Sequence, residues 1–247
     1  MPDDLDARKD ARERLLRKAK KAIEEALADL GEQERELLET DRSYTTGDRV
    51  MLGNHWGKRG ATRKRLAEVE FLLNEGDWRA TLQAAQADYG RGLAAHFTDH
   101  WILGQFVVLR SVLDSAARTG QEARHSSPPN EWEEACRAVR LGLRSGDPYE
   151  KMWAWSSFVD LHMVALRENW PSEDLTSKPV RQDLEEMVSV VGGADLCPAV
   201  WPTFRQFWRW RDWWRDPAWA AEAEEGYAFL YEIVKPRLPA RIIEKTE

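Results

Sequence analysis

The spacing of hydrophobic positions is helical along almost the whole chain. In residues 5–40, apolar side chains recur at steps of three and four in an otherwise charged segment with one glycine and no proline. This spacing predicts one long amphipathic helix with a narrow apolar stripe. Residues 41–49 form a polar break with turn-forming residues. We therefore expect a charged N-terminal helix over residues 1–41 and a second domain over residues 42–247.

Two interpretations of the N-terminal helix remain open. Its charge pattern is typical of a solvated helix that packs lightly on the rest of the protein. The alternative is a coiled-coil arm, which would span fewer than four heptads and be weak alone because its stripe is rich in alanine.

The rest of the chain divides into apolar-periodic segments separated by short polar turns. Gly76-Asp77 and the segment 145–148 carry turn and helix-capping residues. Residues 115–130, rich in Ser, Pro and Gly, are the longest break and predict a surface loop. Strand-like alternation is nearly absent, so we expect about eight helices. After the N-terminal helix, the helical segments are 50–74, 78–95, 101–113, 131–144, 149–168, 179–191, 201–215 and 217–235.

Tryptophan recurs at regular intervals among the chain's 13 tryptophans. Trp56, Trp78, Trp101, Trp132 and Trp153 follow one another at 22, 23, 31 and 21 residues. A bulky side chain returning at this spacing predicts stacked two-helix units, each anchored against its neighbour. These tryptophans are therefore expected to be mainly architectural.

Residues 69–102 partly fit a two-helix repeat of the tetratricopeptide kind, whose period is about 34 residues. Ala85 falls at the small crossing site of a second helix, Tyr89 follows where an aromatic is expected, and Gly92 is a further small residue. Gly76-Asp77 supplies the turn between the helices. The fold class predicted is all-α, a tetratricopeptide-like helical repeat array or α-solenoid with a long charged N-terminal helix.

Four segments together resemble a bacterial family of divergent tetratricopeptide-repeat proteins. They are LGNHWGKRGA at 52–61, HWILGQFVVLRSVL at 100–113, WAWSSFVDLHMVAL at 153–166 and WPTFRQFWRWRDWW at 201–214. Such regions are similar to the helical regulatory region that binds adaptors in certain eukaryotic stress kinases, and in bacteria they accompany caspase-like or CHAT peptidases. The resemblance implies a scaffold, sensor or regulator in a bacterial antiviral defence or signalling assembly. The chain departs from a complete member because it has no recognisable peptidase, kinase or nucleotide-hydrolysing domain.

Composition narrows the class of partner. The net charge of −7 and the pI near 5.4 argue against a general nucleic-acid binder, which needs a basic face. Cys136 and Cys197 form no CxxC pair, and two free thiols suit a reducing cytoplasm. The charged N-terminus does not resemble a secretory signal, and no apolar run approaches the ~20 residues that span a bilayer. We expect a cytoplasmic protein without a membrane partner.

The candidate ligand motifs are weak. Gly53, Gly57 and the following Lys58-Arg59 miss the spacing and the Ser or Thr of a phosphate-binding loop, so close helix packing at the glycines is expected instead. The basic run from Lys58 to Arg65 is expected to be a solvated face, with an anion or acidic-partner patch as the alternative. His96 and His100 could bind zinc at i,i+4 spacing, but Asp99 or Thr98 between them predicts a turn and a helix cap.

No catalytic constellation stands out. Cys136 and His125 are close in sequence, but Cys136 lies on an apolar stripe, and His162 is expected to be a core or rim histidine. Paired carboxylates at 133–134 and 185–186 are expected on charged helix surfaces. We therefore predict a protein that is not an enzyme, with no catalytic residues, no metal and no cofactor. An unrecognised enzyme is the remaining alternative.

The segment 201–215, WPTFRQFWRWRDWWR, is unusually rich in tryptophan and arginine. On an α-helix, Phe204, Phe207, Trp208, Arg211 and Trp214 share one side, whereas Arg205, Arg209, Trp210 and Trp213 lie off it. Trp and Arg are enriched at interface hot spots. The candidate protein-binding residues are Arg205, Trp208, Arg209, Trp210, Arg211, Trp213 and Trp214.

These patterns predict a non-enzymatic protein-binding scaffold or regulatory subunit, with another protein as its partner. The resemblance implies a caspase-like or CHAT peptidase, or the target of one, as that partner. The alternative is a nucleotide or small-ligand sensor that uses the Arg/Trp-rich segment 201–215, where bases could stack between aromatic and arginine side chains. An internally buried 201–215 helix is a third interpretation.

Overall fold

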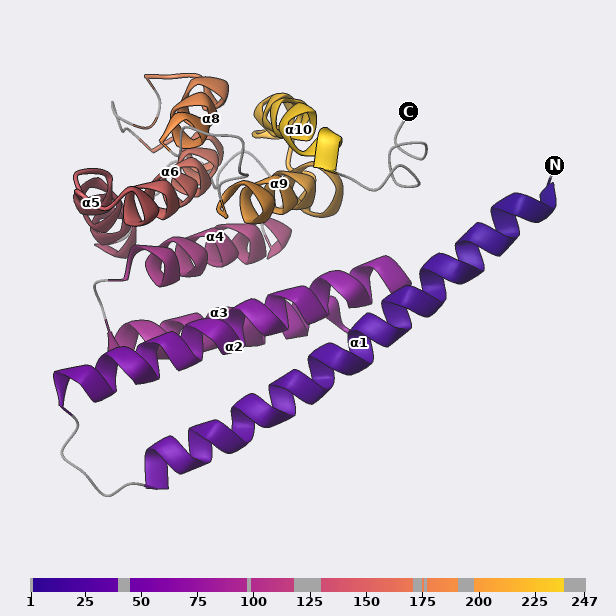
Figure 1. Ribbon diagram of the computed structural model, residues 1–247, viewed down its shortest axis with the longest axis horizontal. Coiled ribbons are helices and arrows are strands. Elements are labelled where there is room, and N and C mark those ends of the chain that lie inside the picture. Colours follow the sequence, from indigo (N-terminus) through magenta and orange to yellow (C-terminus); the bar gives the residue numbers. More distant parts are fainter. Residues whose placement is uncertain are drawn as a thin grey trace. The chain divides into compact units, whose positions relative to one another are not determined.

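The computed structural model describes residues 2–39, 45–96, 99–117, 130–170, 175, 177–190 and 198–237. In these ranges all regular secondary structure is helical, which confirms the predicted all-α class (Figure 1). The chain forms two compact units, residues 1–102 and 103–247, which are described separately below. No helix in the described ranges is both long and apolar enough to span a bilayer.

The first unit contains α1 (Pro2–Glu39), α2 (Thr46–Leu73), α3 (Trp78–Ala95) and the first turn of α4 (His100–Ala117). The helix predicted over residues 5–40 is confirmed as α1, which packs on α2 in the same unit. Thr45 begins α2 with a capping box, in which its side chain accepts from the Asp48 amide and Asp48 accepts from the Thr45 amide. The predicted boundary between residues 41 and 42 lies in a segment outside the described residues.

The turns of this unit follow the predicted residues. Asn74 ends α2 in the left-handed conformation, and Gly76 has a φ of 70°, which favours glycine. Asp77 then caps α3 by accepting from the Ala80 amide at 3.1 Å. Asp99 caps α4 by accepting from the amides of Trp101 and Ile102, so the predicted helix cap is confirmed there.

Glycines on one face of α2 allow the close approach of α3 and of the first residues of α4. A β-carbon at Gly53 would lie 2.7 Å from the His96 β-carbon, and one at Gly60 would lie 3.0 Å from the Tyr89 ring. A β-carbon at Gly57 would lie 2.8 Å from Trp101 and 3.1 Å from Ile102, at the start of α4. The expectation that Gly53 and Gly57 serve helix packing is therefore confirmed, and Gly60 has the same role.

The second unit holds the remainder of α4 and the elements that follow it. These are α5 (Asn130–Leu143), α6 (Pro148–Glu168), α8 (Val180–Ser189), α9 (Val200–Trp208), the π-helix η2 (Arg209–Trp214), α10 (Ala220–Val234) and the 3-10 turn η3 (Lys235–Arg237). Helix α6 is the centre of this unit, because most of its residues from Met152 to Ala165 are buried. Gln105 and Ser111 of α4 donate to the buried Asp160 and Glu168 of α6, at 2.8 and 2.9 Å.

The turn between α2 and α3 and the turn between α5 and α6 have the same Gly-Asp sequence, 70 residues apart in the chain. Gly146 and Asp147 correspond to Gly76 and Asp77, and Asp147 caps α6 by accepting from the Tyr149 amide at 2.9 Å. Of the five recurring tryptophans, Trp56 and Trp132 are buried, whereas the other three are half-buried. Each unit thus contains a helical hairpin with this turn. The assembly of such hairpins into a repeat array stays a prediction.

Candidate protein-binding surface

The segment 201–215 changes helix type at its middle. Helix α9 continues directly into the π-helix η2, in which the Arg215 amide donates to the Trp210 carbonyl five residues earlier, at 3.1 Å. Arg215 then ends the helix with a φ of 43°. A π turn holds more residues than an α turn. The buried residues nevertheless continue from α9 into η2 at steps of three and four, as Thr203, Phe207, Trp210 and Trp213.

Three of the candidate residues lie in the core of the second unit. Arg209, Trp210 and Trp213 are 5%, 1% and 5% exposed. The expectation that they lie off the core-facing side is therefore wrong. The buried side of the segment is the one that carries Thr203, Gln206 and Phe207, and Trp210 and Trp213 follow these at helical steps of three and four. In this structure these three side chains pack within the protein and are not available to a partner.

The buried part of the segment is closely packed and hydrogen-bonded. The indole N–H of Trp219 donates to the Trp210 carbonyl at 3.3 Å, and Arg209 donates to the Gln206 side chain at 2.8 Å. A β-carbon at Gly226 of α10 would collide with the ring of Phe207. Helices α9 and α10 therefore approach closely, and the surface above them is held on a rigid support.

The other four candidates reach the surface. Arg205 is exposed, and Trp208, Arg211 and Trp214 are half-buried. Trp201, which begins the segment, is 41% exposed, the most among the described tryptophans. The accessible part of the predicted site is therefore its N-terminal half together with Arg211 and Trp214.

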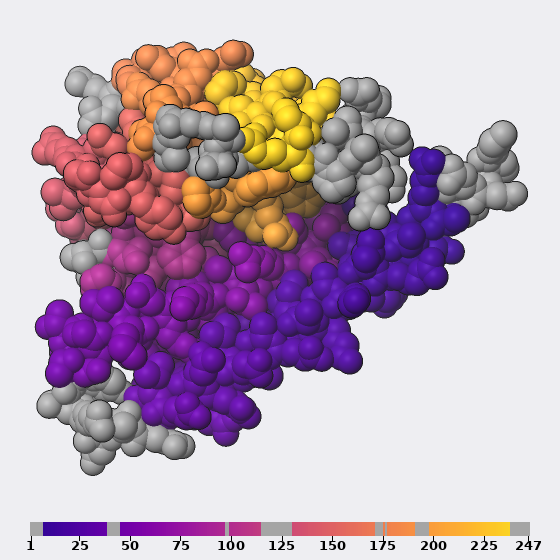
Figure 2. Space-filling view, in the orientation of Figure 1, coloured from indigo at the N-terminus to yellow at the C-terminus, as the bar shows by residue number. Residues whose placement is uncertain are grey.

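Around Trp201 the structure builds a cluster that we call the aromatic ladder: Trp201 and Phe204 of α9 with Tyr227 and Tyr231 of α10. The Phe204 ring stacks on Tyr227 at 4.8 Å between centroids, and Tyr227 lies 6.1 Å from Tyr231 with planes only 8° apart. Trp201 meets Phe204 edge to face at 6.3 Å. The rings of Phe204, Tyr227 and Tyr231 are all half-buried. Helices α9 and α10 lie beside each other in Figures 1 and 2.

Two cations lie against rings of the ladder. The Arg211 guanidinium lies 3.6 Å above the centroid of the Tyr227 ring, and the Lys235 ammonium lies 5.6 Å from the centroid of Tyr231. Arg211 also pairs with Asp212 at 2.7 Å. Burial raises the pKa of the Tyr227 phenol, and Arg211 partly offsets that rise. Tyr227 is therefore neutral at physiological pH and presents a polar edge on an apolar body.

The residues of α10 are the part of the surface that sequence reasoning missed. Tyr227 and Tyr231 have i,i+4 spacing, which places both on one side of α10. That spacing was visible in the sequence, but nothing in it identified α9 as the helix that packs beside them.

A second charged cluster lies in the first unit, on α2 and α3. Asp88 is fully buried and accepts from Arg63 at 2.5 Å and from Arg91 at 3.3 Å, while Arg59 lies 3.7 Å away. Burial raises the Asp88 pKa, against the lowering effect of these three arginines. The guanidiniums of Arg59 and Arg91 lie 4.9 and 4.7 Å from the Trp56 ring centroid. The cluster therefore joins α2 to α3.

The expectation of a solvated basic face is wrong for part of the run. Arg59 and Arg63 are half-buried and Lys64 is buried, because α3 brings Asp88 against this side of α2. Only Lys58 and Arg65 are exposed. The pairing with a distant carboxylate could not be read from the run itself.

The histidine and carboxylate candidates occupy structural positions. His162 is 2% exposed, as expected of a core histidine, and its Nδ1 lies 2.9 Å from the fully buried Asp183. Among the described residues no group of three His, Cys, Asp or Glu side chains could hold a metal ion. Cys136 is a buried free thiol, whereas His125 and Cys197 lie outside the described residues.

The predicted surface carboxylates are confirmed as such. Glu133 and Glu134 pair with Arg137 at 3.3 and 2.5 Å on the outside of α5. Glu185 pairs with Arg181 at 3.0 Å, with both side chains about half exposed.

The chain matches no protein-family model, no curated protein and no solved structure. The resemblance to tetratricopeptide-repeat proteins therefore stays a prediction, and the argument for function rests on the chain's own surface.

Proposed function

We propose that this protein is a non-enzymatic scaffold or regulatory subunit that binds another protein through the aromatic ladder of α9 and α10. The observation that carries the proposal is the exposed Trp201 beside three stacked rings, with Arg211 over the Tyr227 ring. Trp, Tyr and Arg are the residues most enriched at hot spots of protein interfaces. A charge-flanked aromatic surface of this kind suits a partner with an apolar anchor and nearby carboxylates.

The packing beneath the ladder favours binding. Stacked aromatic rings have few rotatable bonds, so ordering them on association costs little conformational entropy. Their support is fixed by the close approach of Gly226 to Phe207 and by the buried Trp210. The surface is therefore preorganised on two helices.

The class of partner is taken from the resemblance to divergent bacterial tetratricopeptide-repeat proteins. That resemblance implies, as the partner, a caspase-like or CHAT peptidase, or the target of one, in a bacterial defence or signalling assembly. A tetratricopeptide-like array would then present the ladder, as helical-repeat proteins present binding residues on helix faces.

The test is affinity capture with matched variants. The wild type, Trp201→Ala with Tyr231→Ala, and the control Leu141→Ala are each used as bait in a lysate of the source cells. Leu141 is 70% exposed on α5, so its substitution removes an exposed apolar side chain elsewhere in the same unit. The proposal requires a protein that is retained by the wild type and the control, is lost with the ladder variant, and binds directly when purified. Identical capture by all three baits would remove the ladder as the binding surface.

A second candidate function is a nucleotide or small-ligand sensor. It is favoured by the Arg211 guanidinium over the Tyr227 ring, since arginine and aromatic faces are the groups on which bases stack. Its test is quenching of tryptophan fluorescence by nucleotides, with Arg211→Ala as the variant and Arg205→Ala as a control of equal charge change. Absence of quenching at millimolar nucleotide would eliminate this candidate.

A further inference from the structure

Helix α1 separates its charges along its length. Residues 8–21 carry eight basic and two acidic side chains, whereas residues 22–39 carry seven acidic and one basic side chain. Residues 8–21 are thus strongly positive and residues 22–39 strongly negative, while Asp3, Asp4 and Asp6 begin the helix. The helix macrodipole favours anions in the first turn and cations in the last turn, and its effect does not reach the two interior blocks. No basic residue lies in the last turn of α1. The separation is therefore not explained by the stability of the isolated helix.

Only a few of these charges of α1 form ion pairs with α2 or with Glu75. Arg17 and Lys20, near the middle of α1, lie 2.7 and 3.7 Å from Glu75, which follows α2. Nearer the C-terminal end of α1, Glu34 pairs with Arg59 in the middle of α2. The two helices run antiparallel, so the basic block of α1 meets a carboxylate and its acidic block meets an arginine. Each half of α1 still has many exposed charges, including Arg12 and Asp29, and no ion pair to either is found within the described ranges.

One flank of α1 is left uncovered. The stripe that faces α2, which includes Leu16, Ile23 and Leu27, is only half-buried. Beside it, Leu15 is 68% exposed. Ala19, Ala22 and Ala26 continue from Leu15 at steps of four, three and four, and all three are exposed. These four residues, with Arg12 before them and Asp29 after them, form the uncovered flank of α1.

We propose that the uncovered flank pairs with the same flank of a second copy of this chain, with the two α1 helices antiparallel. A two-fold axis between Ala19 and Ala22 places Leu15 of one copy opposite Ala26 of the other. It also places Arg12 opposite Asp29, so the apolar centre is closed by an ion pair at each end. The large leucine meets the small alanine, which lets the helices approach closely. A parallel pair would instead set basic half against basic half.

The size of the contact sets the expected strength. From Arg12 to Asp29 the flank runs for about 25 Å at 1.5 Å per residue. A contact of this length buries less surface than a standard stable interface, so we expect reversible dimers at protein concentrations on the order of 10–100 µM. Because part of the attraction is between exposed charges, added salt should weaken the dimer.

The experiment is sedimentation velocity on the full chain with charge reversals. Arg12→Glu alone and Asp29→Arg alone each replace two attractive pairs by two repulsive ones, so each should raise the dissociation constant of the dimer by about tenfold. The double variant R12E/D29R restores both pairs in the opposite sense and should return to wild-type association. Mixing the two single variants should also restore dimers, as mixed pairs.

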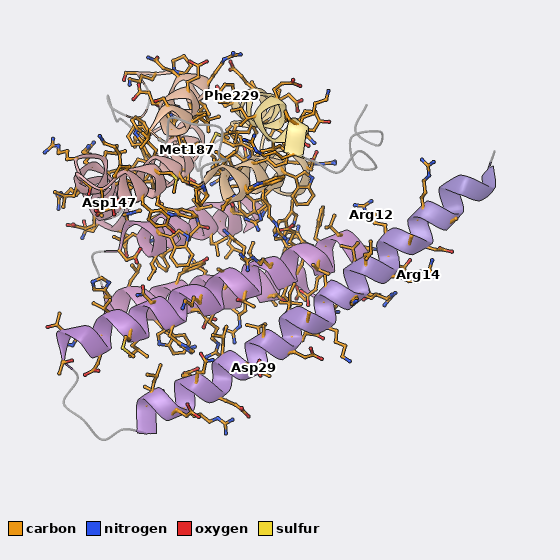
Figure 3. All side chains as sticks on the ribbon, viewed as in Figure 1. Arg12, Arg14, Asp29, Asp147, Met187 and Phe229 are labelled. Atoms are coloured by element: carbon orange, nitrogen blue, oxygen red, sulfur yellow. The ribbon has the colours of Figure 1, made fainter. Side chains whose placement is uncertain are left out.

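The matched control is Arg14→Glu. Arg14 is exposed and lies two residues from Arg12, so it projects about 200° around the helix from it. Figure 3 labels both. The Arg14→Glu substitution changes the net charge by the same amount as Arg12→Glu and should leave the dimer intact. A wild type that stays monomeric up to ~200 µM, well above the expected range, overturns the proposal. Equal weakening by Arg14→Glu and Arg12→Glu, or no rescue in R12E/D29R, overturns the antiparallel pairing. Circular dichroism melting confirms that each variant is folded.

Discussion

The substitution Gly60→Ala tests the close packing of α2 on α3. In an unpacked helix, alanine is about 1 kcal/mol more favourable than glycine, so the change would stabilise α2. In this protein the added β-carbon would lie 3.0 Å from two ring carbons of Tyr89 and 3.1 Å from the Ala85 carbonyl oxygen. Tyr89 is fully buried and the carbonyl belongs to the α3 backbone, so neither has room to move away. Overpacking of this kind costs about 1–3 kcal/mol, and we expect a net destabilisation of about 1 kcal/mol.

Gly31→Ala is the matched control within the same unit. Gly31 lies inside α1, and an added β-carbon there meets no atom within 4 Å. The same chemical change should therefore stabilise the protein, by up to about 1 kcal/mol. Urea denaturation of both variants measures the two free energies of unfolding, provided that the slope against denaturant is unchanged. If Gly60→Ala stabilised the protein as Gly31→Ala does, the argument from close glycine contacts would be refuted.

Three further predictions concern buried groups. Asp88→Asn should destabilise the protein by about 3 kcal/mol, because it leaves partly buried arginines without their carboxylate, whereas Glu133→Gln on the surface of α5 should change the urea midpoint little. Burial lowers the pKa of His55 below its ordinary value of 6.5, so folding resists its protonation and stability falls as the pH drops below that value. His55→Gln should therefore flatten the dependence of the urea midpoint on pH between about pH 8 and pH 5. Trp210→Ala should cost about 3–5 kcal/mol because the side chain is fully buried, while Trp201→Ala at the surface should cost about 1 kcal/mol, both measured by urea denaturation.

The features that depend on local chemistry could be predicted from the sequence. Asp77 and Asp99 precede apolar-periodic segments, and both cap the helices that follow. Gly53, Gly57 and Gly60 fall on one face of a predicted helix, where glycine is otherwise unfavourable, so close packing was the consistent explanation. Caps are fixed by residues within one turn of each other. The partners of the three glycines lie 25 or more residues away, so the sequence indicated the close face of the helix but not what packs against it.

The features that depend on distant residues could not be predicted. Arg63 binds Asp88, 25 residues along the chain, and neither residue type nor spacing identifies that pair. The candidate surface failed for a related reason. A helical wheel shows which residues of the segment share a side, but not which side faces the core, because that depends on the helices that pack against it. Trp210 and Trp213 share the side of Thr203 and Phe207, which is the buried side. The tryptophan content singled out the segment 201–215, but it did not indicate which side of the segment is exposed.

The two proposals have a joint consequence that separates them experimentally. If α1 pairs two copies, each particle carries two aromatic ladders, and a partner with two binding sites gains affinity by the effective concentration of the second ladder. Arg12→Glu should then reduce the apparent affinity for a two-site partner while leaving the affinity for a one-site partner unchanged. Trp201→Ala should weaken both affinities and leave the dimer intact. A two-site partner bound equally well by the wild type and by Arg12→Glu would mean that pairing through α1 does not contribute to recognition.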